Sequence, residues 1–100
     1  MHSIEWAAGL FEGEGCIDTN KNGLILKMTD LDVVEKFHSV FGVGNIRPIL
    51  DSHPNHKDQW RWCIYAKSEV VRIVSLMLPY LGNRRAYKAL NILDNIELKQ

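Results

Sequence analysis

The chain has 100 residues, of which 46% are hydrophobic and 24% charged, as is ordinary for one globular domain over residues 1–100. Its formal net charge is zero, which argues mildly against a nucleic-acid-binding protein. No apolar run is long enough to span a membrane and the N-terminus lacks a signal-peptide pattern, so we expect an intracellular protein with no membrane association. The two cysteines, Cys16 and Cys63, are expected to be free thiols.

The charges are distributed unevenly along the chain. Residues 1–20 contain four acids and no Lys or Arg, so the other eighty residues contain eight of the twelve acids and all twelve bases. An acidic beginning on a basic body fits a metal-binding centre above a phosphate-facing surface, but it fits chance equally well. Charge alone therefore does not choose between function classes.

Hydrophobic periodicity and turn residues predict four helices and four strands. The first helix is expected to begin after Ser3, a good N-cap residue, and to run to about residue 12. The other elements are expected, in chain order, as strands over 16–19 and 24–28, a helix capped by Thr29 or Asp30 that runs to 41, strands over 45–50 and 59–65, and helices over 68–78 and 84–96. This order is typical of an α+β fold in which helices bury one face of an antiparallel sheet and leave the other exposed.

The stretch AAGLFEGEG, Ala7–Gly15, departs from two local preferences. Gly9 and Gly13 lie inside a predicted helix, where each glycine costs roughly 0.8–1.0 kcal/mol relative to alanine. Glu12 and Glu14 lie at the C-terminal end of that helix, where the helix dipole favours cations. Such departures are expected at functional sites, and glycines on one helix face are usual where another backbone approaches closely.

The strand face that points away from the predicted core is rich in long, hydrogen-bonding side chains. Such side chains suit base edges and phosphates, because a two-stranded ribbon fits the major groove of DNA. A solvated sheet face has the same pattern, so the pattern alone leaves both interpretations open. The outward strand residues are Asp18, Lys27, Asn45, Arg47, Gln59 and Arg61, joined by the loop residues Lys21, His53, His56 and Lys57.

The histidines and cysteines combine on paper into a zinc site. His53, His56, Cys16 and Cys63 lack a compact ligand spacing, however, so zinc is not expected.

In the letters Ala7–Gly15 the chain resembles the LAGLIDADG homing endonucleases. Relative to that signature, Leu becomes Ala7, Ile becomes Phe11, the penultimate Ala becomes Gly13, and the two Asp become Glu12 and Glu14. The resemblance continues through the order of the elements, the Trp-rich fourth strand and the segment Leu78-Pro79-Tyr80-Leu81 before a basic pair, so it covers nearly the whole chain. It implies an αββαββα core whose four-stranded antiparallel saddle sheet sits in the major groove of DNA.

The resemblance also implies an active site. Glu14, the second acid of the signature, is the expected catalytic and metal-binding carboxylate, with the Gly13 carbonyl as a further ligand. The expected ion is Mg²⁺, and other divalent cations such as Mn²⁺ or Ca²⁺ can occupy such a site. Family members have a Lys where this chain has Arg84, so Arg84 is expected to steady phosphate charge during catalysis, with Arg85 on DNA beside it. Solvated residues in the first turn of a helix are the alternative for both arginines. Asp30 lies where other members have a polar residue that reaches toward water, although a helix cap is the favoured interpretation.

One copy of the signature implies the homodimeric branch of the family, which recognises palindromic or near-palindromic double-stranded DNA. Packing of two signature helices around a two-fold axis gives Gly9 and Gly13 a role, with Glu12 and Trp6 in the same interface. The resemblance also implies that Glu12, the first acid of the signature, is a structural residue at the helix end rather than a metal ligand. The DNA contacts are expected from the outward sheet face, its loops and the last helix: Lys21, Lys27, Asn45, Arg47, Lys57, Gln59, Arg61 and Arg85.

Together these expectations describe a homodimeric homing endonuclease that hydrolyses phosphodiester bonds at a specific double-stranded DNA site with Mg²⁺. One alternative is a catalytically inactive DNA-binding regulator or an RNA-splicing maturase on the same scaffold, which the net charge of zero and Arg84 in place of Lys leave open. A second alternative is a structural dimerisation module that touches no nucleic acid.

Overall fold

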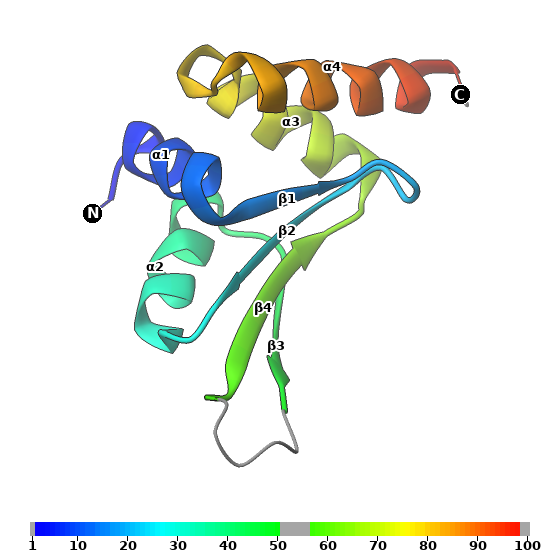
Figure 1. Cartoon of the computed structure of the whole chain (residues 1–100). Helices are drawn as coiled ribbons and strands as arrows, with labels where there is room; N and C mark the ends of the chain where they lie inside the picture. Colours follow the sequence, from blue (N-terminus) through cyan, green and yellow to red (C-terminus); the bar gives the residue numbers. More distant parts are fainter. Residues whose placement is uncertain (1, 51–56, 99–100) are drawn as a thin grey trace.

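The computed structural model describes residues 2–50 and 57–98 (Figure 1). Its helices are α1 (Ile4–Glu14), α2 (Leu31–Phe41), α3 (Lys67–Met77), the short 3₁₀ turn η1 (Leu78–Tyr80) and α4 (Asn83–Leu98). Its strands are β1 (Gly15–Asp18), β2 (Gly23–Met28), β3 (Asn45–Ile49) and β4 (Gln59–Ile64). The α+β order predicted from the sequence is confirmed. Most of the predicted 51–58 loop, with His53 and His56, lies outside the described residues.

The four strands form one antiparallel sheet in the order β1-β2-β4-β3. β3 is an edge strand, which is where Pro48 is tolerated because an edge residue need not donate a ladder hydrogen bond. The helices gather on one side of the sheet, and α4 lies outermost, against α3 and β1 (Figure 1). None of the described helices combines the length and the apolar composition needed to cross a membrane.

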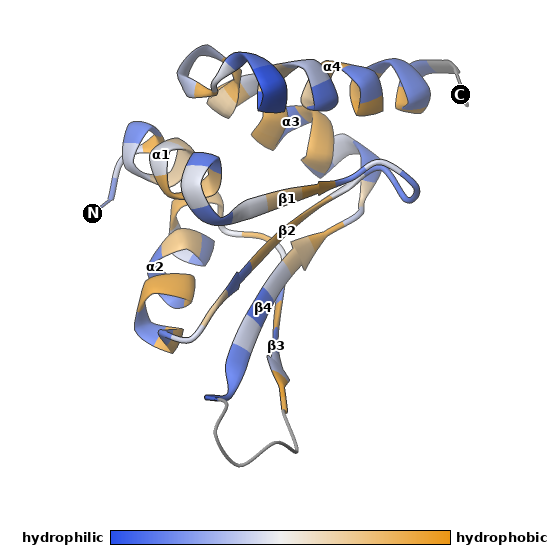
Figure 2. Cartoon of the chain, viewed as in Figure 1, coloured by the Kyte–Doolittle hydropathy of each residue, from blue (hydrophilic) through white to orange (hydrophobic). Residues whose placement is uncertain are grey.

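The core forms between the sheet and the helices. Phe37 of α2 is fully buried and meets Trp62 of β4 edge-on, with ring centroids 4.8 Å apart. The ring centroid of Phe41 lies 5.3 Å from that of Phe37. Phe11 of α1 stacks on Phe37, with ring centroids 6.3 Å apart. Figure 2 shows hydrophobic stretches in the helices and in the strands that enclose this core. The aromatic cluster therefore joins α1, α2 and the central strand β4.

The connection between α2 and β3 depends on glycine. Gly42 ends α2 in the left-handed conformation, with φ 73°, and its N–H donates to the His38 carbonyl at 2.8 Å. Gly44 has φ 102°, and a Cβ atom there would overlap the indole of Trp62. The same indole donates to the Val43 carbonyl at 2.9 Å. Trp62 thereby fixes the entry of β3 against its neighbour β4.

Helix α1 runs two residues further than predicted, through Glu14. The Ser3 hydroxyl accepts the Trp6 N–H at 3.0 Å, which confirms the predicted N-cap. Gly15 ends the helix in an extended conformation and also begins β1. The last turn contains Glu12 and Glu14 but no base. Both acids therefore lie within the helix, against its dipole.

Helix α2 begins differently from the expectation. Of the two predicted N-cap residues, Asp30 occupies the N-cap position, but its side chain accepts no capping hydrogen bond. Its backbone carbonyl instead accepts the N–H groups of Val33 and Val34 at 3.1 and 3.2 Å. Only the backbone of Asp30 therefore contributes hydrogen bonds to the first turn of α2. Asp30 itself is exposed.

Candidate functional site

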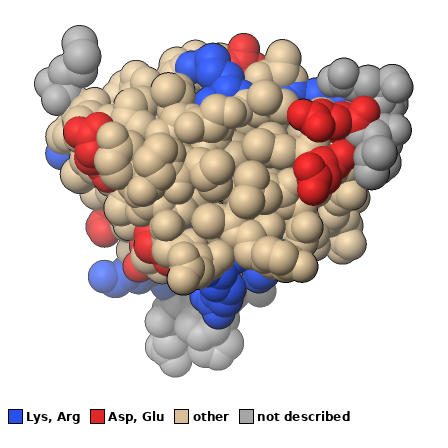
Figure 3. Space-filling view, turned by 90° about the horizontal axis from the view of Figure 1, so that it is seen from above, with Lys and Arg blue, Asp and Glu red and all other residues tan. Residues whose placement is uncertain are grey.

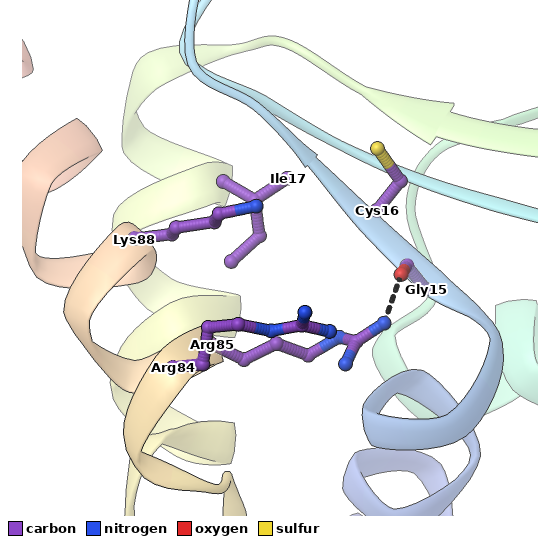
Figure 4. Close-up of a pocket in the computed structure, with 6 residues that line it drawn as sticks. All are labelled: Gly15, Cys16, Ile17, Arg84, Arg85 and Lys88. Atoms are coloured by element: carbon purple, nitrogen blue, oxygen red, sulfur yellow. Dashed lines mark hydrogen bonds between the residues drawn. The ribbon is translucent and has the colours of Figure 1, made fainter.

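A set of polar contacts, which we call the α1–α4 clasp, joins Glu12, Gly15, Gly82 and Arg85. The Glu12 carboxylate accepts the Gly82 N–H at 2.6 Å and pairs with Arg85 Nη1 at 3.2 Å. Arg85 Nη2 donates to the Gly15 carbonyl at 2.8 Å (Figure 4). The clasp thus ties the end of α1 and the beginning of β1 to the beginning of α4.

The clasp uses two side chains that were both predicted to be site residues, and Glu12 was also expected to be a structural residue at the helix end. The Arg85 side chain is only 17% exposed, and the Glu12 side chain is 38% exposed. Arg85 was predicted to contact DNA, and Glu12 was placed in the dimer interface. Both stay predictions, but the structure already gives each side chain charged partners inside the chain. Charge-assisted hydrogen bonds of this kind are stronger than neutral ones, so they hold the two elements firmly.

Glu14 is the last residue of α1 and is exposed. The final carbonyls of a helix, here including that of Gly13, have no partner within the helix. A carboxylate with carbonyl oxygens is a donor set that Mg²⁺ and Ca²⁺ prefer, with water and phosphate oxygens completing the shell. Among the described residues, no group of three or more His, Cys, Asp or Glu side chains is arranged to hold a metal ion. The exposed Glu14 carboxylate and the helix-end carbonyls are oxygen donors, and the described part of the chain holds no assembled metal site.

A pocket of about 120 Å³ lies between the edge strand β1 and the first turns of α4 (Figure 4). Its lining contains three cationic side chains and no carboxylate, so its charge suits an anion. Arg84 lines it as a predicted site residue, whereas Lys88 was not predicted. The spacing of four residues between Arg84 and Lys88 places both on one face of α4, and this spacing is the signal that could have revealed Lys88. The lining residues are Gly15, Cys16, Ile17, Arg84, Arg85 and Lys88.

The outward face of the sheet carries a row of three cations, Lys27, Arg61 and Arg47. The antiparallel register places Lys27 of β2 opposite Arg61 of β4, and Arg61 opposite Arg47 of β3. Because neighbouring strands lie about 4.8 Å apart, the row spans about 10 Å. Like charges directly opposite one another destabilise a sheet, and an anion on this face would relieve that repulsion.

The rest of the predicted contact face is less strongly charged. The next outward row across the sheet consists of Asn45, Cys63, Ile25 and Cys16. Cys16 is exposed and Cys63 is buried, and both thiols are free, as predicted. Gln59 is the exposed first residue of β4, one step beyond the cation row on the same face. The structure thus brings the predicted strand residues together on one surface.

Two predicted contact residues lie at opposite ends of the sheet. Lys21 is in the turn between β1 and β2, where the Asp18 carboxylate accepts the N–H groups of Asn20 and Lys21 at 3.1 and 3.0 Å. Lys57 is exposed and lies just before β4, at the end of the sheet opposite the β1–β2 turn. These lysines flank the cation row rather than join it.

The side of the molecule over α3 and α4 looks different. Figure 3 shows that its middle is mostly uncharged and that Lys, Arg, Asp and Glu lie mainly toward its periphery. The two helices also carry exposed hydrophobic residues, among them Leu76, Tyr87 and Leu90. The clustered cations therefore lie on the outward sheet face and in the pocket beside β1.

The glycine face of α1 is open. A Cβ atom at Gly9 or Gly13 would meet nothing within 4 Å, and both residues are exposed. Among the described residues, nothing crowds either position, so contacts within the chain do not explain the two glycines. Trp6, which was predicted to share the dimer interface, is half-buried against the core, and its ring lies 4.6 Å from that of His2. The dimer interface stays a prediction.

Comparison with known proteins agrees with this geometry at the level of the fold. No protein-family model and no curated protein matches the chain by sequence. Among solved structures, it is similar to two crystal structures of the homing endonuclease I-CvuI bound to DNA, with TM-scores of 0.77 and 0.76 and 19% sequence identity in each case. The chain has the LAGLIDADG homing-endonuclease fold.

The match covers unequal shares of the two chains. Each alignment covers 94% of this chain but 65% of the I-CvuI chain, so this chain spans about two thirds of the length of that enzyme. One I-CvuI complex holds the I-CreI target, uncleaved, in the presence of 2 mM Mg, and the other holds its own target in the presence of 2 mM Ca. At 19% identity the similarity establishes the fold of this chain.

Tyr65, directly after β4, donates its hydroxyl hydrogen to the Asp18 carboxylate at 3.4 Å. Burial, and after it the Asp18 charge, raise the pKa of the Tyr65 hydroxyl above its usual value of 10.0. A group whose folded-state pKa is raised stabilises the fold fully below its unfolded-state pKa. This contribution is therefore complete below pH about 10 and is lost as the pH rises through the folded-state pKa.

We predict that Asp18→Asn lowers the pKa of the Tyr65 hydroxyl toward 10.0. The substitution removes the negative charge but keeps a side-chain oxygen for the N–H groups of Asn20 and Lys21. The measurement is an NMR pH titration of the tyrosine rings, with Tyr65→Phe to assign the signal. An unchanged pKa in Asp18→Asn would contradict the assigned cause.

Proposed function

We propose that this chain is one subunit of a homodimeric, metal-dependent endonuclease that cuts a specific site in double-stranded DNA. The observation that carries the proposal is the cation row of Lys27, Arg61 and Arg47 on the open face of a LAGLIDADG-type sheet. The exposed signature acid Glu14 lies at the end of α1, where the edge strand of that sheet begins.

The cation row supports binding to DNA through its size and its chemistry. Its span of about 10 Å is comparable to the major groove, which is about 12 Å wide and admits a two-stranded ribbon. Arginine binds phosphate or the acceptor edge of guanine through two parallel hydrogen bonds. Asn45 and Gln59 on the same face add amides that pair with the edge of adenine. A zero net charge is thus compatible with a local cationic surface.

Cleavage is proposed to centre on Glu14. Its carboxylate and the Gly13 carbonyl would hold a divalent cation such as Mg²⁺, because hard oxygen donors at an open position fit that ion. When bound, the ion supplies a positive charge for the phosphate and favours deprotonation of water. Arg84, in the cationic pocket beside β1, is suited to bind the phosphate oxygens and to neutralise the charge that develops there.

The homodimer is proposed because the described part of one chain is incomplete as a site. Its proposed metal-binding acid, Glu14, sits at the end of a helix whose open face carries Gly9 and Gly13. Packing of this face against its two-fold copy would be an isologous contact. The two glycines would let the two helix backbones approach each other closely. The second copy would bring a second Glu14 and a second cation row, which suits a palindromic or near-palindromic site.

A second candidate is a protein that binds DNA or RNA without cutting it, as a regulator or a splicing maturase. The observation that favours it is Arg84, since arginine is a poorer partner than lysine for proton transfer. A plasmid-nicking assay with and without Mg²⁺ separates the two functions. Nicking that requires the ion supports the endonuclease, and sequence-specific binding without nicking supports the second candidate.

We predict that Glu14→Gln reduces the cleavage rate about 100-fold or more but leaves DNA affinity largely unchanged, because it removes a ligand of the metal and not a DNA contact. Single-turnover cleavage and fluorescence anisotropy on the same duplex measure the two effects. Glu35→Gln on α2, an exposed acid on the helix side of the sheet, is the matched control and should cleave normally. Equal reductions of cleavage and binding in Glu14→Gln would contradict the role of Glu14.

We also predict that Arg47→Ala and Arg61→Ala each weaken discrimination between sites by about 1–3 kcal/mol for every base that the arginine recognises, because alanine cannot donate the paired hydrogen bonds. A binding selection over a randomised duplex reads the change in sequence preference. Lys36→Ala on α2 removes an exposed cation from the helix side and should leave the preference unaltered. If all three variants select the same sequences as the unsubstituted protein, the cation row does not read DNA.

A further inference from the structure

The cationic pocket between β1 and α4 contains a lysine that the proposed function does not use. Lys88 lies on the second turn of α4, four residues after Arg84, and both side chains line the pocket (Figure 4). The volume of about 120 Å³ is well above the roughly 10–15 Å³ that a single water needs. The pocket therefore has room for a larger group than one solvent molecule.

The three cations of the pocket are not equivalent. Arg85 is engaged by the Glu12 carboxylate and the Gly15 carbonyl, so its charge is already balanced within the chain. Within residues 2–50 and 57–98, Arg84 and Lys88 form no ion pair. Both are exposed, and no carboxylate is among the lining residues. Arg84 and Lys88 thus give this part of the pocket a local excess of positive charge.

The spacing of Arg84 and Lys88 is unfavourable in the absence of an anion. Like charges four residues apart on a helix repel each other and destabilise an isolated helix. The clasp nevertheless holds this turn of α4 against β1, so the two side chains stay together beside the strand. Arginine offers a planar fork of donors and lysine a compact ammonium, and together they match the charged oxygens of a phosphate diester.

We propose that Arg84 and Lys88 form a phosphate-binding subsite for the DNA backbone, in which Lys88 supplies the ammonium group. This proposal rests on the proposed function and assigns Lys88 as a further residue of the same site. The Lys88 ammonium binds a backbone phosphate in this pocket, whose wall includes Gly15, the residue directly after Glu14. The strand residues Gly15, Cys16 and Ile17 form the wall of the subsite and bring no competing charge.

The test is the salt dependence of binding to a duplex of random sequence, measured by fluorescence anisotropy. Each phosphate contact contributes about 0.9 to the slope of log affinity against log salt concentration. Lys88→Met should reduce that slope by about 0.9, and Lys88→Arg, which keeps the charge, should retain it. Lys36→Met is the matched control, because it removes an exposed lysine from α2 and should keep the original slope.

The outcomes separate the subsite from the function on which it rests. If the unsubstituted protein binds DNA and Lys88→Met has the same slope, the subsite is overturned and the proposed function stands. If the unsubstituted protein has no DNA affinity at low salt, both are overturned. Lys88→Gln provides a second neutral variant, so that an unfolded Lys88→Met protein does not decide the result. A circular-dichroism spectrum of each variant establishes that it is folded.

Discussion

The pairing of Glu12 with Arg85 is the interaction on which the rest of the candidate site depends. These residues lie 73 positions apart in sequence, and their charges meet at 3.2 Å where α1 ends and α4 begins. Arg85 also satisfies the Gly15 carbonyl on the edge strand β1. Hydrogen bonds to charged groups stabilise a fold by about 1.5–3 kcal/mol each, so the contact can hold two elements in a fixed relation.

This contact assigns different roles to the two acids of the signature stretch. Glu12 is directed to Gly82 and Arg85, whereas Glu14, two residues later, is exposed at the helix end. The unfavourable position of two acids at a helix C-terminus is offset in part by the Arg85 cation that faces one of them. The other acid remains available to a ligand from outside the chain. The clasp therefore also fixes where the pocket cations stand relative to Glu14.

Much of the fold could be predicted from the sequence because its signals are local. The Ser3 cap, the glycines after α2 and the alternation of Trp60, Arg61 and Trp62 each determine structure through near neighbours. The N-cap position of Asp30 was also predictable, but its side chain makes no capping hydrogen bond and only its backbone carbonyl accepts from the first turn. Such a choice between a side chain and the backbone is not visible in the residue type.

The site was less predictable because its geometry is set by distant pairs. Strand alternation places each cation of the row on the outward face, but only the strand register aligns Lys27, Arg61 and Arg47. Arg85 resembles any basic residue at a helix start until its partners across the fold are known. Lys88 becomes a site residue only because α4 packs against β1. A contact across the fold leaves no local pattern from which to infer it.

The most direct test of this account is a double-mutant cycle on the clasp. The free energies of unfolding of the unsubstituted protein, Glu12→Gln, Arg85→Met and the double variant are measured by denaturant titration. If the two side chains hold α1 to α4 through each other, the coupling energy should be about 1 kcal/mol or more. Single-variant effects that add to the double-variant effect within about 0.5 kcal/mol would contradict the account.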